Sequence, residues 1–307
     1  MYPKILVLAF FYIITTSSFA NDRQEFPVIE QRLNRKAVSI IEFNRDEDRL
    51  EQSRKVYNLF RETLEKKGSF DYPFDSLETI SILKSPDEKF RIITWYVPLT
   101  SGHFKNYGFI QVRDVNNDSS TLYELVDKSM DISEPEFKTL DYDNWFGAYY
   151  YEMIYKSYDG KDYYTLLGWR GNNPLIRQRV IEPVRINSEG IPLFGKEVFK
   201  YKDNQHKRVI FSYSARVSMA LKSDIMHQEE SRRRRSSNEK LIVFDRLFPV
   251  SESLKGHYQF YKPEMNIFDG FVFEKGKWAF LPDIDVRVPG SDVSEPRRLQ
   301  ELLENGR

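Results

Sequence analysis

The strongest constraint on the fold is the dipeptide Asp159-Gly160, which lies between two runs rich in Tyr, Ile and Leu. Both central positions of a type I′ two-residue turn need positive φ, and Asp-Gly is well suited to them. Tyr149–Asn173 is therefore predicted to form a β-hairpin in which Tyr158 faces Lys161. Counting outward from the turn predicts Tyr155 opposite Tyr164, Ile154 opposite Thr165 and Glu152 opposite Leu167.

The two faces of this hairpin are both largely apolar. Side chains alternate across a strand, so each strand divides its residues between two faces. We therefore expect the hairpin to lie in a sheet that is covered on both sides for much of its length. One face is predicted to hold Tyr151, Met153, Tyr155, Tyr164 and Leu166, and the other Tyr150, Glu152, Ile154, Leu167 and Trp169.

Short apolar runs continue on both sides of the hairpin at roughly eight- to twelve-residue spacing, which predicts an antiparallel meander. The expected fold class is mainly β (α+β), with a large antiparallel meander sheet. A β-propeller is the alternative, because Ile80–Val126 resembles one blade, although no later segment repeats it. Arg208–Tyr213 and Ala215–Lys222 are expected to pair with each other. The other expected strands are Thr79–Leu83, Phe90–Pro98, Asn106–Arg113, Thr121–Val126, Arg179–Ile186, Lys196–Tyr201, Leu241–Phe248, Gly270–Phe273 and Trp278–Leu281.

A helical hairpin is predicted before the first strand. From Val28, apolar residues recur at three- and four-residue steps, and a second such helix follows the break at Asn44-Arg45-Asp46. Each helix has one apolar stripe, so the pair must pack against another element. The expected organisation is a signal peptide at 1–20, the helical hairpin at 21–69, an antiparallel β domain at 70–290 and a C-terminal tail at 291–307.

The N-terminus has the pattern of a cleavable secretory signal. Lys4 precedes the apolar run Ile5–Ile14, and Ser18-Phe19-Ala20 provides a small-x-small end. Cleavage is expected after Ala20. A run of roughly ten apolar residues is too short to span a bilayer, and the absence of cysteine excludes a lipoprotein anchor. The mature protein is therefore expected to be periplasmic or secreted, with no membrane span.

Composition excludes several classes of function. There is no cysteine, which excludes disulfide scaffolds, thiolate zinc sites and cysteine nucleophiles. Lys+Arg and Asp+Glu both number 46, so the chain has no basic footprint for nucleic acid. The sequence has no P-loop, G-x-G-x-x-G or G-x-S-x-G motif, and its histidines form no i, i+4 pair. No metal or cofactor is expected, and the expected partner is an envelope protein or a glycan.

Three carboxylates are candidates for catalysis. Glu152 lies between apolar neighbours on a strand, where a dry setting would raise its pKa and suit a general acid. Asp283 and Asp285 alternate on the last strand and point to one face, about 7 Å apart. Paired carboxylates at such a separation serve glycoside hydrolysis or bind a metal. The preferred alternative is that Glu152 lies at a sheet rim or pairs with an arginine, and that Asp283 and Asp285 are solvated carboxylates at a polar strand end.

The turn Gly168–Pro174 is the candidate for binding. An exposed Trp169 next to Arg170, Asn172 and Asn173 would suit the rim of a sugar or peptide site. The preferred alternative is a structural turn whose Trp169 is buried against Tyr150.

Two further motifs are interpreted as loops. Asp114–Asp118 begins like a calcium-binding loop, but serine stands at the sixth position and leucine at the twelfth, so a hairpin loop is preferred. Arg232–Arg235 is flanked by glutamates and is interpreted as a solvated loop.

Several stretches after Phe70 resemble an uncharacterised exported-protein family of Bacteroidota-type bacteria. They are Phe74-Asp75-Ser76-Leu77, Ser85-Pro86-Asp87, Tyr164–Trp169 with Gly171-Asn172-Asn173, and Arg208–Met219. The resemblance implies a Gram-negative envelope or secreted location and brings no activity, cofactor or catalytic residue. The family usually has an acidic residue where Arg170 stands here, and this departure weakens a cation-binding role for the turn.

Two hypotheses follow. The first is a non-enzymatic envelope module that binds a partner protein or a glycan through an aromatic surface. The alternative is a hydrolase that acts on an envelope polymer or glycan through Glu152, Asp283 and Asp285. A hydrolase predicts that these carboxylates converge in one aromatic cleft. A binding module predicts dispersed carboxylates and a flat or grooved aromatic patch.

Overall fold

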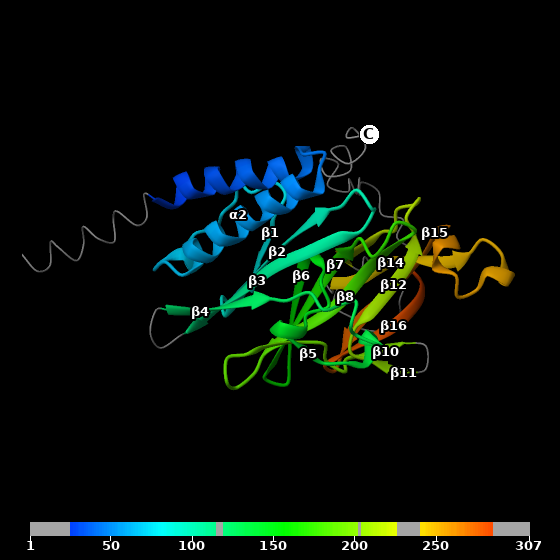
Figure 1. Cartoon of the computed structure of the whole chain (residues 1–307). Coiled ribbons are helices and arrows are strands. Elements are labelled where there is room, and N and C mark those ends of the chain that lie inside the picture. Colours follow the sequence, from blue (N-terminus) through cyan, green and yellow to red (C-terminus); the bar gives the residue numbers. More distant parts are fainter. Residues whose placement is uncertain (1–24, 115–118, 202–203, 226–239, 285–307) are drawn as a thin grey trace, which may run out of the picture.

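The computed structural model describes residues 25–114, 119–201, 204–225 and 240–284. Within them, a helix over residues 25–42 and helix α2 (Asp46–Leu64) cover one side of a stack of three β-sheets (Figure 1). The predicted class is confirmed: the protein is mainly β, its sheets are antiparallel in nearly all pairings, and a helical hairpin packs on them. The strands are divided among three sheets, and the described part contains no closed barrel or propeller. Short 3₁₀ helices are formed by Ser69–Asp71, Pro135–Phe137, Tyr142–Asn144, Glu252–Leu254 and Tyr258–Phe260.

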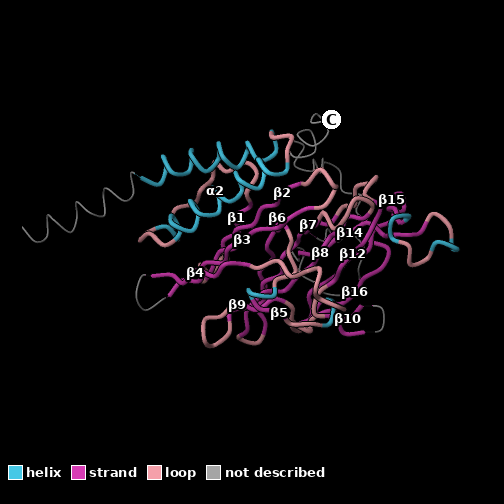
Figure 2. Tube along the Cα trace, viewed as in Figure 1, coloured by secondary structure: helices cyan, strands magenta, loops and turns pink. Residues whose placement is uncertain are grey.

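The first sheet is a continuous meander that lies directly under the helices (Figure 2). Its second strand is buried along almost its whole length, because alternate side chains enter two different cores. Trp95 faces the helices and packs with Phe60 of α2, whereas Phe90 faces the second sheet. The strands, in spatial order, are β1 (Ser81–Lys84), β2 (Phe90–Pro98), β3 (Phe104–Asp114) and β4 (Ser119–Leu125).

The second sheet contains the predicted hairpin, and its turn and strand pairing are confirmed. Asp159 and Gly160 have φ of 50° and 67° and join β6 (Tyr149–Tyr158) to β7 (Lys161–Arg170). All four predicted cross-strand pairs are present. One core separates this sheet from the first and another separates it from the third, so both of its faces are covered. Its order is β5 (Leu140–Asp141), β9 (Pro192–Phe194), β8 (Ile176–Ile186), β7, β6, with β12 (Val209–Ser214) also paired to β8.

The predicted faces are wrong at Tyr150 and Tyr151, which exchange faces, and at Trp169, which packs on the first sheet rather than on the side of Leu167. The register shifts between Tyr150 and Glu152, which leaves one extra residue on β6. Tyr150 therefore joins Met153 in the core toward the first sheet, whereas Tyr151 joins Ile154 in the core toward the third. Strict alternation counted from the turn cannot detect a bulge.

The third sheet closes the stack. The prediction that Arg208–Tyr213 pairs with Ala215–Lys222 is wrong, because β12 pairs with β8 and the following strand pairs with Lys240–Pro249 (β14). A turn closed by Val217 N donating to Ser214 O carries the chain from the second sheet to the third, so the two runs enter different sheets. The order is β11 (Asn204–His206), β10 (Phe199–Tyr201), β16 (Lys277–Ile284), β15 (Tyr261–Glu274), β14 (Lys240–Pro249) and β13 (Leu221–Ile225), with β10 and β16 parallel.

A fully buried ion pair fixes the connecting segment before β6 to the second sheet. Arg208 Nε donates to Glu182 at 2.6 Å, and both side chains are 0% exposed. The hydroxyl of Tyr150 donates to the other Glu182 oxygen, and Trp145 Nε1 donates to that hydroxyl at 3.0 Å. The Arg208 guanidinium also donates to the backbone oxygens of Pro135, Lys138 and Phe194. Every charge in this network has partners, as burial requires.

Several sequence predictions lie outside the described residues: the signal peptide, the Arg232–Arg235 loop, Asp285 and most of the Asp114–Asp118 motif. β3 and β4 pair on either side of that motif, with Asp114 opposite Ser119. A search of the described helices finds none with the length and apolar character needed to cross a membrane.

Candidate functional site

Glu152 joins the edges of two sheets. Its carboxylate accepts from Ser223 N at 3.1 Å and from the Ser223 hydroxyl. Ser223 lies on β13, the edge strand of the third sheet. The carboxylate therefore accepts from a backbone N–H group that points away from that sheet. Next to it, the Tyr151 hydroxyl donates to Leu221 O at 2.7 Å. These contacts give Glu152 a structural role.

Asp283 lies apart from Glu152. It pairs with Arg246 at 2.7 Å, and its side chain is 72% exposed. Asp283 lies on β16, and Ser223, which binds Glu152, lies on β13. Strands β14 and β15 lie between them, so β16 and β13 are about 14 Å apart at normal strand spacing. Glu152 and Asp283 therefore share no cleft. Within the ranges that the structure describes, no group of three or more His, Asp or Glu could hold a metal ion.

The turn at Trp169 has its polar groups directed inward. Trp169 is half-buried and packs against Tyr96 and Phe104 of the first sheet, with ring centroids 5.1 and 5.2 Å away. These two rings, and not Tyr150, are its aromatic neighbours. The amide oxygen of Asn173 accepts from the backbone N–H groups of Leu175 and Ile176, both at 2.9 Å, which stabilises the turn.

Arg170 is buried in the same region. It donates to Gln178 at 3.0 Å, to Asn172 at 3.5 Å and to the Ser129 hydroxyl. Its guanidinium lies 4.7 Å from the ring centre of Phe146, and burial lowers its pKa. Arg170 and Asn172 thus hold the turn together, as a structural role requires, but the expected burial of Trp169 against Tyr150 is wrong.

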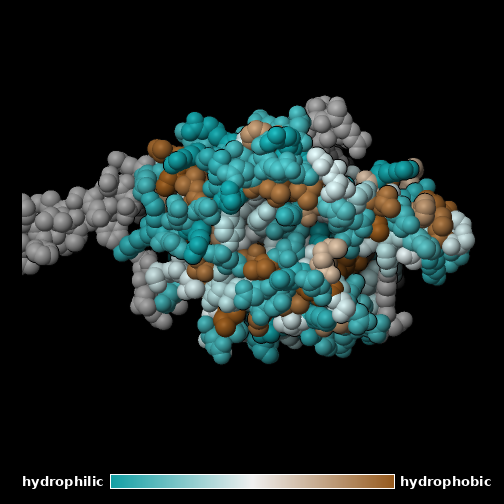
Figure 3. All heavy atoms as spheres, viewed as in Figure 1, coloured by the Kyte–Doolittle hydropathy of each residue, from teal (hydrophilic) through white to brown (hydrophobic). Residues whose placement is uncertain are grey.

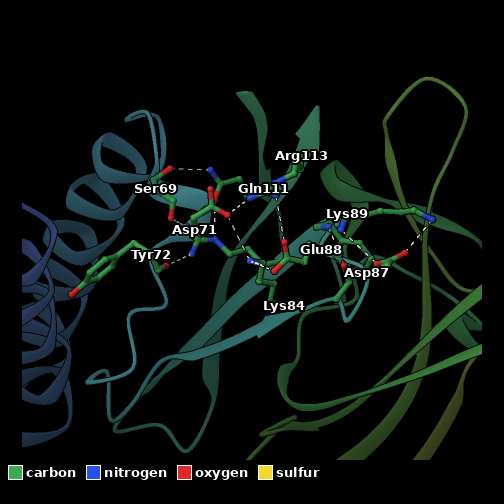
Figure 4. A network of polar contacts seen from close by, with 12 residues as sticks. Ser69, Asp71, Tyr72, Lys84, Asp87, Glu88, Lys89, Gln111 and Arg113 are labelled. Atoms are coloured by element: carbon green, nitrogen blue, oxygen red, sulfur yellow. Dashed lines mark hydrogen bonds and ion pairs between the residues drawn. The ribbon is translucent and has the colours of Figure 1, made fainter. Parts of the chain in front are cut away.

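A polar groove of about 270 Å³ lies at the end of α2, beside the network of Figure 4. Asp71 pairs there with Arg113 and, at 3.8 Å, with Lys84. Arg113 also contacts Glu88 at 3.5 Å and lies 4.4 Å from the ring centre of Phe70. These acidic and basic side chains already pair with one another, so the groove is a weak candidate for a ligand site.

The same network fastens the β1–β2 turn to the central hairpin. The ammonium group of Lys89 lies 3.1 Å from the carboxylate of Asp87 (Figure 4) and 2.6 Å from that of Asp162 on β7. Burial raises the pKa of Asp87, but hydrogen bonds from Tyr164, Ser85 and Lys89 outweigh it and hold that pKa below its ordinary value. Hydrogen bonds from Lys89 and Tyr155 likewise lower the pKa of Asp162.

The larger groove, of about 460 Å³, lies between α2 and the first residues of β3. On the face shown in Figure 3 hydrophilic side chains predominate, and apolar side chains form separate small patches. No large apolar patch of the described residues on this face indicates a binding surface, so a groove is the better candidate for a binding site. We call this groove the aromatic groove. Its apolar lining is Leu50, Tyr57 and Tyr107, and its charged lining is Glu47, Glu51, Arg54 and Lys105.

Tyr107 is the outermost ring of a stack that reaches into the core. It stacks on Trp95 with 5.6 Å between centroids and 13° between planes, and Trp95 stacks on Phe60 at 6.2 Å. Trp95 is held in turn by donating from Nε1 to Ser53 at 3.1 Å. Because Trp95 and Phe60 are buried, Tyr107 is fixed from behind. Tyr107 itself is half-buried and lines the groove.

Tyr57 forms the second wall of the groove. Its ring meets Tyr107 edge-on, with centroids 6.5 Å apart and planes at 66°. Its hydroxyl donates to Glu124, which also pairs with Arg61 at 2.9 Å. Burial and the Glu124 carboxylate raise the pKa of Tyr57, so its hydroxyl stays neutral and donating at physiological pH. The two tyrosines form a corner of the groove.

The charged rim offers both a donor and an acceptor. Glu51 is already engaged by Arg54 and by Lys55 at 3.4 Å. Glu47 and Lys105 form no ion pair within the described part of the chain, and both are exposed. A ligand on the aromatic corner could therefore hydrogen-bond to a carboxylate and to an ammonium group.

Sequence reasoning missed this site. It predicted the second helix with its apolar stripe and a strand at Asn106–Arg113, and both elements are present as α2 and β3. A tyrosine at the edge of a helical stripe is usually a core residue, and only the tertiary structure shows which strand residue faces it.

Comparison of the chain with known protein families, with curated proteins and with solved structures finds no match in any of the three. The function must therefore be argued from the chain itself.

Proposed function

We propose that the protein is an exported, non-enzymatic binding module of a Gram-negative cell envelope, and that its aromatic groove binds a glycan chain. The observation that carries the proposal is Tyr107, an aromatic platform fixed from behind by a buried stack and open to the groove in front. The N-terminal signal pattern and the resemblance to an exported family support the location.

The groove suits a saccharide for three reasons. A sugar ring has an apolar C–H face that packs on an aromatic ring, while its hydroxyls need polar partners at the edge. Tyr107 and Tyr57 supply the aromatic surface, and Glu47 and Lys105 supply an acceptor and a donor. A volume of about 460 Å³ also lies within the range of roughly 300–1,000 Å³ typical of ligand sites.

Binding is favoured over hydrolysis by the positions of the carboxylates. Glycoside hydrolysis needs two carboxyl groups that flank the scissile bond. Glu47 and Glu51 of the groove lie one turn apart on the same helix face, so both approach a ligand from the same side. Glu152 and Asp283 lie elsewhere and are engaged by Ser223 and Arg246. Glu152 and Asp283, the described carboxylates on which the hydrolase alternative depends, therefore do not form a pair.

The test uses the mature protein and defined probes. Co-sedimentation with isolated peptidoglycan sacculi and calorimetry with chitohexaose and cellohexaose measure binding in the wild type and in Tyr107→Ala. We expect at least one probe to bind and Tyr107→Ala to weaken it about tenfold, which corresponds to about 1.4 kcal/mol. Tyr258→Ala, at an exposed tyrosine away from the groove, is the matched control and should bind normally.

A second groove variant guards against loss of folding. Glu47→Gln changes an exposed side chain at the rim, so it should fold normally and weaken binding of the same probe. The proposal fails if no probe binds, or if both groove variants bind as the wild type does. Release of reducing ends from chitohexaose or cellohexaose would instead support the hydrolase.

A further inference from the structure

Three cations from three different segments lie around one aromatic ring, close to the hairpin end of strands β7 and β8 in the second sheet. Lys161 and Tyr163 are two residues apart on β7, so their side chains point to the same face. Tyr164 pairs with Val184 of β8, and the next antiparallel pair places Arg185 opposite Tyr163. The ammonium group of Lys196 lies 3.8 Å from the ring centre of Tyr163.

Lys196 reaches this position because the chain leaves the second sheet there. Gly195, with φ of 86°, donates from its backbone N to Pro183 O at 2.7 Å and ends the pairing of β9 with β8. A Cβ at Gly195 would lie 2.6 Å from Lys138 O, so only glycine fits. The chain then crosses to β10 of the third sheet, and Lys196 lies on this crossing.

These cations have no acidic partner. Among the described residues, no ion pair or hydrogen bond joins Lys161, Arg185 or Lys196 to a carboxylate. Elsewhere in the same region the chain does pair its charges, as Lys89 with Asp87 and Asp162 shows. Burial lowers the pKa of Lys196, and repulsion by Arg185 and Lys161 lowers it further. A bound anion would relieve that repulsion.

We infer that Lys161, Arg185 and Lys196 form an anion site that binds a phosphoryl group, with Tyr163 as its floor. Arg185 can donate two parallel hydrogen bonds to oxygens of one group, and the two lysines add point charges. Lys161 is exposed and the other two side chains are partly exposed, so a ligand can reach them. The site shares no residue with the aromatic groove and stands independently of the proposed glycan binding.

Two probes distinguish the possible sources of the phosphoryl group. Inorganic phosphate is titrated calorimetrically at constant ionic strength, with chloride replaced in equal measure. Vesicles of phosphatidylcholine with and without phosphatidylglycerol are tested by co-sedimentation. Binding of phosphate alone indicates a soluble ligand, and capture by phosphatidylglycerol vesicles indicates a lipid headgroup.

Three variants make the test decisive. Lys196→Met and Lys161→Met should each weaken binding of the responsive probe at least fivefold, and Lys161 is exposed enough that its replacement should leave folding intact. Lys55→Met, which removes an exposed lysine paired with Glu51, should bind as the wild type does. The inference is overturned if neither probe binds, or if Lys196→Met and Lys161→Met bind as tightly as Lys55→Met.

Discussion

Replacing Arg208 by methionine should reveal how strongly the buried ion pair determines stability. The substitution keeps much of the side-chain volume but leaves Glu182 with a buried charge and only the Tyr150 hydroxyl as a donor. Removing one partner of a buried pair costs about 3–5 kcal/mol, because the remaining charge is uncompensated. The backbone oxygens of Pro135 and Lys138 also lose a donor. This is a large fraction of the roughly 5–15 kcal/mol by which domains are stable.

The assay is urea unfolding at neutral pH, followed by tryptophan fluorescence and by circular dichroism. Arg54→Met is the matched control, since Arg54 pairs with Glu51 at the surface with 69% of its side chain exposed. Such surface pairs contribute about 0–1 kcal/mol. The double variant Arg208→Met/Glu182→Gln should recover at least about 1 kcal/mol, because the orphaned charge is gone.

The stabilising role of the ion pair would be refuted if Arg208→Met lowered the free energy of unfolding no more than Arg54→Met does. It would also be refuted if the double variant were less stable than Arg208→Met alone. Either result would mean that the charge of Glu182 is compensated by groups other than Arg208.

Two further predictions concern the central hairpin. The lowered pKa values of Asp87 and Asp162 stabilise the fold at pH values above the ordinary value of 3.8. This contribution should be lost as pH falls through 3.8 and through the lower pKa values of the folded state. Urea unfolding between pH 3 and 7 should therefore show a steeper loss of stability in the wild type than in Lys89→Met, and equal slopes would contradict the role of Lys89. Gly160→Ala should lower the free energy of unfolding by about 1–2 kcal/mol. The cost should come from the positive φ alone, because a Cβ at this position would meet nothing within 4 Å. An unchanged thermal midpoint would show that the turn relaxes to another type.

The hairpin was predictable because its determinants are local. Asp159-Gly160 sets the turn type, the turn sets the register, and the apolar residues on both faces indicate cover on both sides. The helical hairpin was predictable for the same reason, since each helix carries its own apolar stripe.

The rest depended on distant contacts. The extra residue at Tyr151 fits the core of another sheet, and nothing in its neighbours marks it as a bulge. β12 pairs with β8 because the chain turns after Ser214, and the apolar pattern of the two runs is the same for either pairing. The aromatic groove needs Tyr107 beside Tyr57, fifty residues earlier, and no short-range pattern encodes that meeting.

The middle sheet has a consequence for how this chain can evolve. Leu166 and Leu167 are neighbours on β7, both 0% exposed, and they enter opposite cores. Deleting or adding a single residue in this strand would exchange the contents of both cores at once. Length changes should therefore accumulate in the outer loops, while the strands of the middle sheet keep a fixed length even where their side chains are replaced by others of similar size.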